Sequence, residues 1–210
     1  MALLLPNSVF YHVPKTGGTW IRAAIARGGL PVQEVGQGSP SDYVSSLQEM
    51  KIAFFHAAPK DIFLPDKFRF CFVRHPLTWY QSQWAFHTVR KWRGNGEFVR
   101  LFRSDHFNEF VHKCTESRPG LVSAIYKKYD AVSFVGKYES LAADLVKALH
   151  MAHEDFDEQA LRATTPKNVR AQCPDMWHKC QYTEELKQLV LESEHEAIEK
   201  YGYSELAVSV

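Results

Sequence analysis

A lysine followed by two adjacent glycines marks the stretch of this chain best suited to binding an anion, Pro14–Thr19 (PKTGGT). An apolar, β-branched and aromatic segment precedes it, and a helix-forming run begins at Trp20. The pattern predicts a strand, a tight loop and a helix. The first turn of such a helix has backbone N–H groups without partners at the positive end of its dipole. Because glycine lets the backbone wrap closely around an anion and Lys15 adds a charge, we predict a phosphate-binding loop.

The order of these residues differs from that of a Walker A loop, in which four residues separate the first glycine from a Gly-Lys-Ser/Thr sequence. Here Lys15 precedes both glycines. A nucleoside triphosphatase of the Walker type is therefore disfavoured. An ordinary turn between a strand and a helix, with a lysine on the surface, would fit the same residues.

A second candidate anion site follows Phe68–Val73 (FRFCFV), the most strand-like run of the sequence. The run is apolar on both faces except for Arg69 and predicts a central strand. Arg74 follows it, Pro76 suits the first turn of the next helix, and Ser82 lies one to two turns into that helix. A guanidinium fork matches the geometry of a phosphate, so Arg74 is a candidate phosphate ligand.

A histidine and a tyrosine also stand at the ends of predicted strands. Lys51–His56 predicts a buried strand, which would place His56 at the carboxyl edge of a parallel sheet, where ligands bind in open α/β sheets. Ala131–Lys137 predicts another strand, followed by Tyr138 and a helix. A tyrosine ring with its hydroxyl suits contact with a purine. Taken alone, His56 could cap a strand, and Tyr138 could lie in the core or on the surface.

Together, these landmarks resemble the sulfotransferases that use PAPS (3′-phosphoadenosine 5′-phosphosulfate) as sulfate donor. The loop through Trp20 resembles the family's 5′-phosphosulfate loop. The strand–arginine–proline–helix–serine order that ends at Ser82 resembles its 3′-phosphate site, and the Tyr-Glu-x-Leu sequence at 138–141 resembles its adenine-contacting turn. His56–Pro59 is close to its His-x-Pro-like turn, with one extra residue before the proline. The resemblance covers residues 11 to about 141.

The resemblance implies transfer of a sulfuryl group from PAPS to a hydroxyl or amine of an acceptor, with PAP as the product and no metal. It implies that Lys15 and His56 are catalytic, with His56 as the base; His12, His75 and His87 are alternative bases. The usual Arg-Lys-Gly of the family's cytosolic branch, which closes over the 3′-phosphate, is absent here. The donor-binding residues that the resemblance implies are Lys15, Thr16, Gly17, Gly18, Thr19, Trp20, Arg74, Ser82, Tyr138 and, as candidates for the closing contact, Lys167 and Arg170.

Two other classes of protein stay open. A nucleotide-binding kinase or nucleoside triphosphatase would need magnesium and would prefer ATP, but no acidic residue is placed like a Walker B aspartate. A non-catalytic PAPS-binding protein would bind PAP without sulfating an acceptor. The presence of both Lys15 and His56 argues against this second class.

Length and composition set the wider expectations. The 210 residues predict one domain, residues 1–210. Strands followed by helices predict an α/β fold with a parallel central sheet flanked by helices, and the resemblance implies the P-loop-like sulfotransferase fold. The formal net charge of +1 disfavours nucleic acid or a membrane surface as partner. The apolar run before Pro6 is too short to span a membrane, and the four cysteines are few for a disulfide scaffold. We expect a soluble, cytoplasmic protein with a small-molecule acceptor.

Three further segments carry predictions. Arg90–Arg103 has five basic residues against Glu97 alone and predicts either a mobile basic flap over the acceptor site or a solvated helix end and loop. His106–Cys114 predicts a helix with one buried face. Thr183–Lys200 predicts an amphipathic terminal helix with Thr183 as its N-cap.

Overall fold

The structure is a computed structural model that describes residues 2–35, 57–62, 64–94, 96–165 and 174–203. Its internal contacts divide the chain into two compact units. Unit 1 contains residues 1–73 and 128–166, and unit 2 contains residues 74–127 and 167–210. That the chain forms one domain over residues 1–210 stays a prediction.

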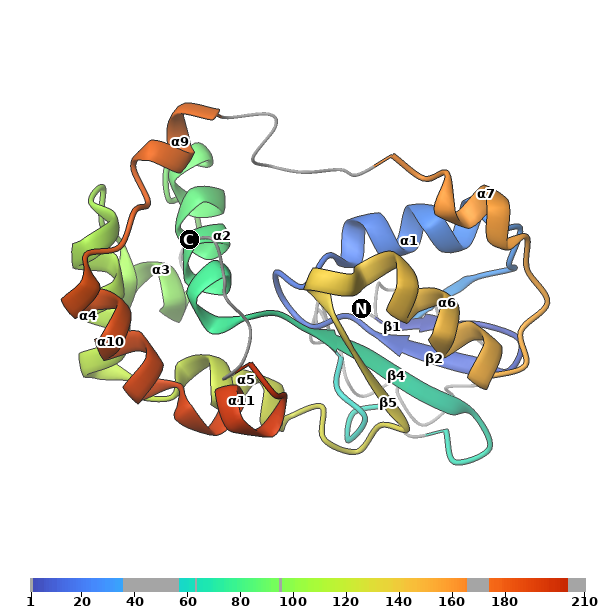
Figure 1. Cartoon of the computed structure of the whole chain (residues 1–210). Helices are drawn as coiled ribbons and strands as arrows, with labels where there is room; N and C mark the ends of the chain where they lie inside the picture. The colour runs from blue at the N-terminus through green and yellow to red at the C-terminus, as the bar shows by residue number, and fades with distance from the viewer. Residues whose placement is uncertain (1, 36–56, 63, 95, 166–173, 204–210) are drawn as a thin grey trace. The chain divides into compact units, whose positions relative to one another are not determined.

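Unit 1 contains a five-stranded mixed sheet (Figure 1). Its strands are β1 (Ala2–Leu4), β2 (Ser8–Tyr11), β3 (Gln33–Val35), β4 (Phe68–Val73) and β5 (Phe134–Lys137). They lie in the order β3-β1-β2-β4-β5. β4 runs parallel to both β2 and β5, whereas β1 pairs antiparallel with β2 and with β3.

The prediction of an α/β fold with helices flanking the sheet is confirmed. The prediction of a parallel sheet holds for β2, β4 and β5 and is wrong for β1, which makes the sheet mixed. Only the segment Leu5–Asn7 joins β1 to β2. A connection this short can only return the chain antiparallel, because a parallel crossover needs a dozen or more residues. β4 has the predicted bounds, and β5 covers the second half of the predicted Ala131–Lys137 strand. The strand predicted at Lys51–His56 lies outside the described residues.

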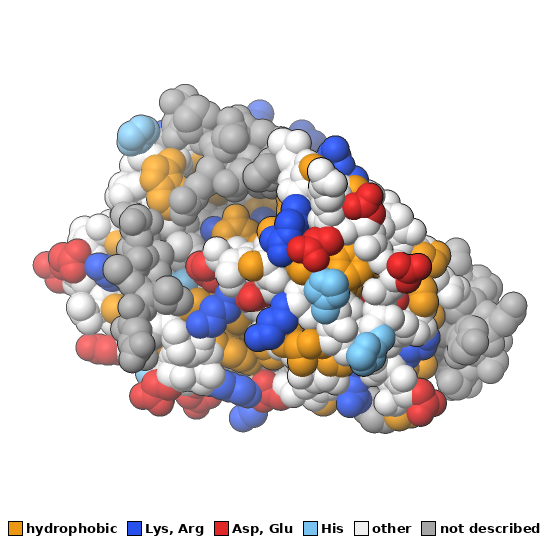
Figure 2. All heavy atoms as spheres, turned by 45° about the vertical axis from the view of Figure 1, so that its right-hand side comes forward, with side chains coloured by type: hydrophobic (Ala, Val, Ile, Leu, Met, Phe, Trp, Pro, Cys, Tyr) orange, Lys and Arg blue, Asp and Glu red, His pale blue; other side chains and the backbone are white. Residues whose placement is uncertain are grey.

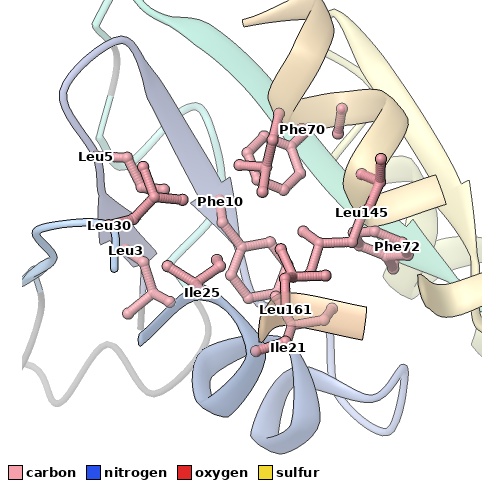
Figure 3. Packing of buried hydrophobic residues seen from close by; sticks show 14 of the residues in the cluster. Leu3, Leu5, Phe10, Ile21, Ile25, Leu30, Phe70, Phe72, Leu145 and Leu161 are labelled. Atoms are coloured by element: carbon pink, nitrogen blue, oxygen red, sulfur yellow. The ribbon is translucent and has the colours of Figure 1, made fainter. Parts of the chain in front are cut away.

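The core of unit 1 lies between one face of this sheet and the helices α1 (Gly18–Arg27), α6 (Leu141–Met151) and α7 (Glu158–Arg162). Phe70 and Phe72 of β4 share this face because alternate residues of a strand point the same way, and Phe10 lies beside Phe70 in the register. These rings fix α1 against β2 and β4, so the loop between β2 and α1 has a fixed base. Figure 3 shows the aliphatic side chains that meet them from the helices: Ile21, Ile25, Leu145 and Leu161.

A short 3-10 turn, η2 (Tyr138–Ser140), joins β5 to α6. Asp144 in the first turn of α6 accepts hydrogen bonds from the backbone N–H of Lys137 and the hydroxyl of Ser140, each at 2.7 Å. These two bonds enclose the turn and hold Tyr138 in place.

In its described residues, unit 2 contains helices joined by turns and loops, and no strand (Figure 1). The predicted helix after β4 begins with Pro76 at its first position, and the predicted helix at His106–Cys114 is present with its inner face buried. The described residues of Arg90–Arg103 form a helix end, a turn and one short helix. The helices are α2 (Pro76–Val89), α3 (Glu97–Phe102), α4 (Phe107–Ser117), α5 (Leu121–Lys127), α9 (Pro174–His178), α10 (Glu184–Ser193) and α11 (His195–Lys200).

The predicted single helix over Thr183–Lys200 is wrong, because the chain leaves helical geometry at Glu194 (φ −108°, ψ 20°). The Glu194 side chain is fully buried. Its carboxylate accepts hydrogen bonds from the Tyr80 hydroxyl at 2.7 Å and from the N–H groups of Val122 and Ser123 at 3.0 and 2.8 Å. The residue therefore caps the start of α5, and this role interrupts its own helix. Thr183 is the N-cap of α10, as predicted, and accepts from the N–H of Leu186.

Charged side chains of both signs lie on the surface, and the described cysteines are buried. Figure 2 shows basic and acidic side chains interspersed with histidines on the face that it presents. Within the described ranges, no helix is both long and apolar enough to cross a bilayer. Cys71, Cys114 and Cys180 are buried, and none forms a disulfide with a residue that the structure describes.

Candidate functional site

The loop between β2 and α1 has the predicted strand–loop–helix order, and α1 begins at Gly18, two residues before Trp20. Gly17 is the N-cap of α1 and is left-handed, with φ of 91°. No described side chain caps this end of the helix, and its first turn contains no acidic residue. The helix dipole and the N–H groups of this turn therefore favour an anion at the loop.

Each of the two glycines is required for its own steric reason. A Cβ atom on Gly17 would lie 2.7 Å from Leu141 Cδ2 and 3.2 Å from Tyr138 Cδ2. A Cβ atom on Gly18 would lie 2.1 Å from Cδ2 and 2.2 Å from Nε2 of the His12 ring. Neither position has room for a side chain, so the backbone of the loop is held tightly between η2–α6 on one side and His12 on the other.

Lys15 and Thr16 complete the loop. Lys15 is half-buried and left-handed, with φ of 65°, a conformation that costs a non-glycine residue about 1–3 kcal/mol. Thr16 is fully buried, and its hydroxyl donates to the carbonyl of Val13 at 2.9 Å. Because this hydroxyl closes the turn, Thr16 can offer a ligand its backbone N–H.

The structure brings Tyr138 to the loop, as its nearness to Gly17 shows. Tyr138 is half-buried, which leaves part of its ring for a ligand. Trp20, in contrast, belongs to the core of unit 1 and is 8% exposed. Its indole Nε1 donates to the carbonyl of Thr164 at 3.1 Å. Of the two predicted donor-binding residues Trp20 and Tyr138, Tyr138 is therefore the better placed to contact an adenine.

Arg74 and Ser82 belong to unit 2. Arg74 is 6% exposed, and its Nε donates to the hydroxyl of Thr78 at 2.9 Å. Its backbone N–H donates to the Tyr126 hydroxyl at 3.0 Å, and that hydroxyl donates to the Arg74 carbonyl at 2.7 Å. Ser82 is half-buried on α2. The arginine is thus held at the point where β4 gives way to α2, in the arrangement that the sequence predicts.

The histidines differ in what they can do chemically. His75 is the N-cap of α2, where its Nδ1 accepts from the N–H of Leu77 at 3.2 Å, and burial lowers its pKa to about 4. His87 stacks on Trp92, with ring centroids 5.0 Å apart. Both rings therefore have structural positions in unit 2. His12 alone among these three lies in the loop of unit 1, partly exposed at the end of β2.

Several predicted site residues fall outside the described residues, namely His56, Lys167 and Arg170. Three contacts of this region were not predicted from the sequence. In the loop, His12 lies against Gly18 and Leu141 against Gly17. In the helix that follows, Trp20 contacts Thr164. No pattern in the sequence marks them, because each depends on how the chain turns. Thr164 is 8% exposed, and its hydroxyl has no partner among the described residues.

The described metal-ligating side chains and the comparisons with known proteins give no further indication of the function. In the part of the chain that the structure describes, no group of three or more His, Cys, Asp or Glu side chains could hold a metal ion. No family model, curated protein or solved structure matches the chain. The fold and the site together define an α/β protein with a candidate anion-binding loop at the carboxyl end of β2, beside the parallel strand β4.

Proposed function

We propose that this protein is a sulfotransferase that transfers a sulfuryl group from PAPS to a hydroxyl or amine of a small-molecule acceptor, and that its fold is the P-loop-like fold of that family. The observation that carries the proposal is the loop at Lys15–Gly18. Its helix start has no side-chain cap and no acidic residue in the first turn, and Tyr138 lies against its N-cap glycine. An anion followed by a purine is the ligand that such neighbours suit.

The proposed reaction is an in-line displacement at sulfur. A bond forms between the acceptor oxygen or nitrogen and the sulfur, while the bond from sulfur to the bridging oxygen of PAPS breaks. Lys15 stabilises the negative charge that grows on that oxygen, which leaves as part of PAP. His56 takes the proton of the acceptor, since an imidazole ring can accept and release a proton near neutral pH. As in phosphoryl transfer, the protein mainly positions the groups and neutralises charge.

Arg74 and Ser82 are proposed to bind the 3′-phosphate that distinguishes PAPS from ATP. The support is the fixed position of Arg74, whose side chain is held by Thr78 at the carboxyl end of β4. A guanidinium held in one orientation loses little entropy when it binds a phosphate. Buried cysteines that form no disulfide with a described residue support a reducing, cytoplasmic compartment for the enzyme.

Ligand-dependent thermal unfolding tests the donor. PAP, ATP, and ATP with magnesium are compared at equal concentrations. A ligand present at a hundred times its Kd stabilises the folded state by about 2.7 kcal/mol. We expect PAP to raise the Tm without magnesium and ATP to do so weakly. A rise seen only with ATP and magnesium would assign the chain to the kinases or nucleoside triphosphatases instead.

Turnover with labelled PAPS separates an enzyme from a non-catalytic binding protein. Metabolite extracts serve as the source of acceptors. We expect transfer of label to a soluble acceptor, and loss of transfer in the His56→Ala variant. Binding of PAP without transfer to any acceptor would contradict catalysis. Retained transfer in His56→Ala would move the role of base to His12, the described histidine that lies in the loop.

A further inference from the structure

We infer that the outer side of α3 and the turn before it form a docking surface for an acidic peptide segment of a partner protein. The surface lies entirely in unit 2, and the inference does not depend on the proposed sulfotransferase activity. We call it the basic surface, and its exposed residues are Arg90, Lys91, Arg93, Arg100, Leu101 and Arg103.

One aromatic cluster holds the two segments of the basic surface side by side. The ring of His87 stacks on Trp92, at 5.0 Å between centroids, and on Phe98, at 5.2 Å. Trp92 and Phe98 both also contact Phe110 of α4. Trp92 comes from the turn and Phe98 from α3, so the turn and the helix are anchored on the same rings.

The aromatic side chains of α3 point inward, and its cations therefore point outward. Phe98 and Phe102 lie four positions apart, on one side of the helix, and pack against each other at 4.9 Å. Arg100 lies half a turn from both and is exposed, as are Arg103 and Leu101. The Leu101 side chain is 44% exposed, which makes it one of the few large apolar side chains on the described surface.

The positive charge of the basic surface is not neutralised by its neighbours. Glu97 is the only acidic residue between positions 90 and 103, and it pairs with Arg118 at 2.8 Å. Lys113 approaches the carbonyl of Arg103 at 2.9 Å, but it is itself paired with Glu109 at 2.6 Å. None of the five cations of the basic surface forms an ion pair with any residue that the structure describes. A partner that brings carboxylates would therefore meet cations that pair with no carboxylate of the described residues, although the Arg90 guanidinium also lies over the Phe86 ring at 4.6 Å.

A peptide fits this surface better than a polysaccharide or a nucleic acid. Single-stranded nucleic acids stack their bases on exposed aromatic rings, and sugar rings likewise pack on aromatic faces. Here Trp92 and Phe102 are each 3% exposed, so neither ring offers such a face. What remains at the surface is guanidinium groups beside the aliphatic Leu101. A peptide that alternates acidic and aliphatic side chains complements both.

Fluorescence anisotropy of the full chain with a labelled peptide of alternating Glu and Val tests the inference. We expect binding that weakens as salt rises, because exposed charge pairs are screened. The double variant Arg93→Glu/Arg100→Glu should raise the Kd by about tenfold or more, since two attractive contacts become repulsive. The double variant Arg90→Glu/Arg103→Glu changes two other cations of the same surface, and we expect it to raise the Kd in the same way.

The matched control is Lys127→Glu/Lys147→Glu, which makes the same change in net charge at two exposed lysines outside the basic surface. We expect it to leave the Kd within about twofold, because neither lysine belongs to the basic surface. Thermal unfolding confirms that each variant is folded. Equal losses in the test and control variants would overturn the inference, as would tighter binding of heparin or of an oligonucleotide than of the peptide.

Discussion

Replacement of Gly18 by alanine tests whether the His12 ring shapes the loop. Gly18 has no positive φ and lies in the first turn of α1. Helix propensity alone favours alanine over glycine by up to about 1 kcal/mol, which predicts a more stable protein. The packing predicts the opposite, because the new Cβ would lie 2.1 Å from His12 Cδ2. Overpacking typically costs about 1–3 kcal/mol. We therefore expect Gly18→Ala to lower the free energy of unfolding by about that amount.

Thermal unfolding measures this effect. In a chain of this size, 1 kcal/mol corresponds to roughly 2–4 °C in Tm. In a His12→Ala background the clash is gone, so Gly18→Ala should become neutral or stabilising, with a coupling energy of about 1–3 kcal/mol. Gly96→Ala is the control, because a Cβ atom there would meet no described heavy atom within 4 Å apart from those of its chain neighbours. The reasoning is refuted if Gly18→Ala is as stable as the original protein when His12 is present.

Four further variants test the roles of single side chains. Lys15→Ala should abolish transfer from labelled PAPS, whereas Arg74→Ala should mainly weaken PAP binding, measured by titration calorimetry. Glu194→Ala leaves the buried donors that it accepts from without partners and should cost about 3–5 kcal/mol in urea unfolding; a loss below about 1 kcal/mol would contradict the capping role. The lowered pKa of buried His75, about 4 against 6.5, means that the unfolded chain binds the proton first as pH falls. The free energy of unfolding should therefore drop by up to about 3 kcal/mol from pH 6.5 to 4, and His75→Asn should remove this pH dependence while it keeps a cap.

Local patterns made the elements around the site predictable. β4 is apolar over its whole length except for Arg69, and the glycine pair after β2 marks the start of α1. The antiparallel start of the sheet was not predictable, because β1 has only three residues, too few to show the pattern of a strand. The break between α10 and α11 at Glu194 was equally unpredictable from the sequence. An amphipathic pattern continues through that residue, and only its distant partners on α2 and α5 give it another role.

The site, like the fold, has features that local sequence patterns predict and features that depend on contacts between distant parts of the chain. The order of Lys15 and the two glycines indicates an anion-binding loop, because those residue types act through the local backbone. Which atoms set the shape of that loop is a property of the fold. Asp144 fixes the turn that carries Tyr138, and the Tyr138 ring in turn lies against Gly17. A ligand that binds the loop and touches Tyr138 would therefore meet two surfaces positioned by one another, with little rearrangement needed on binding. Because of this mutual positioning, we expect the loop to bind the phosphosulfate of the proposed donor and Tyr138 to contact the adenine of the same molecule.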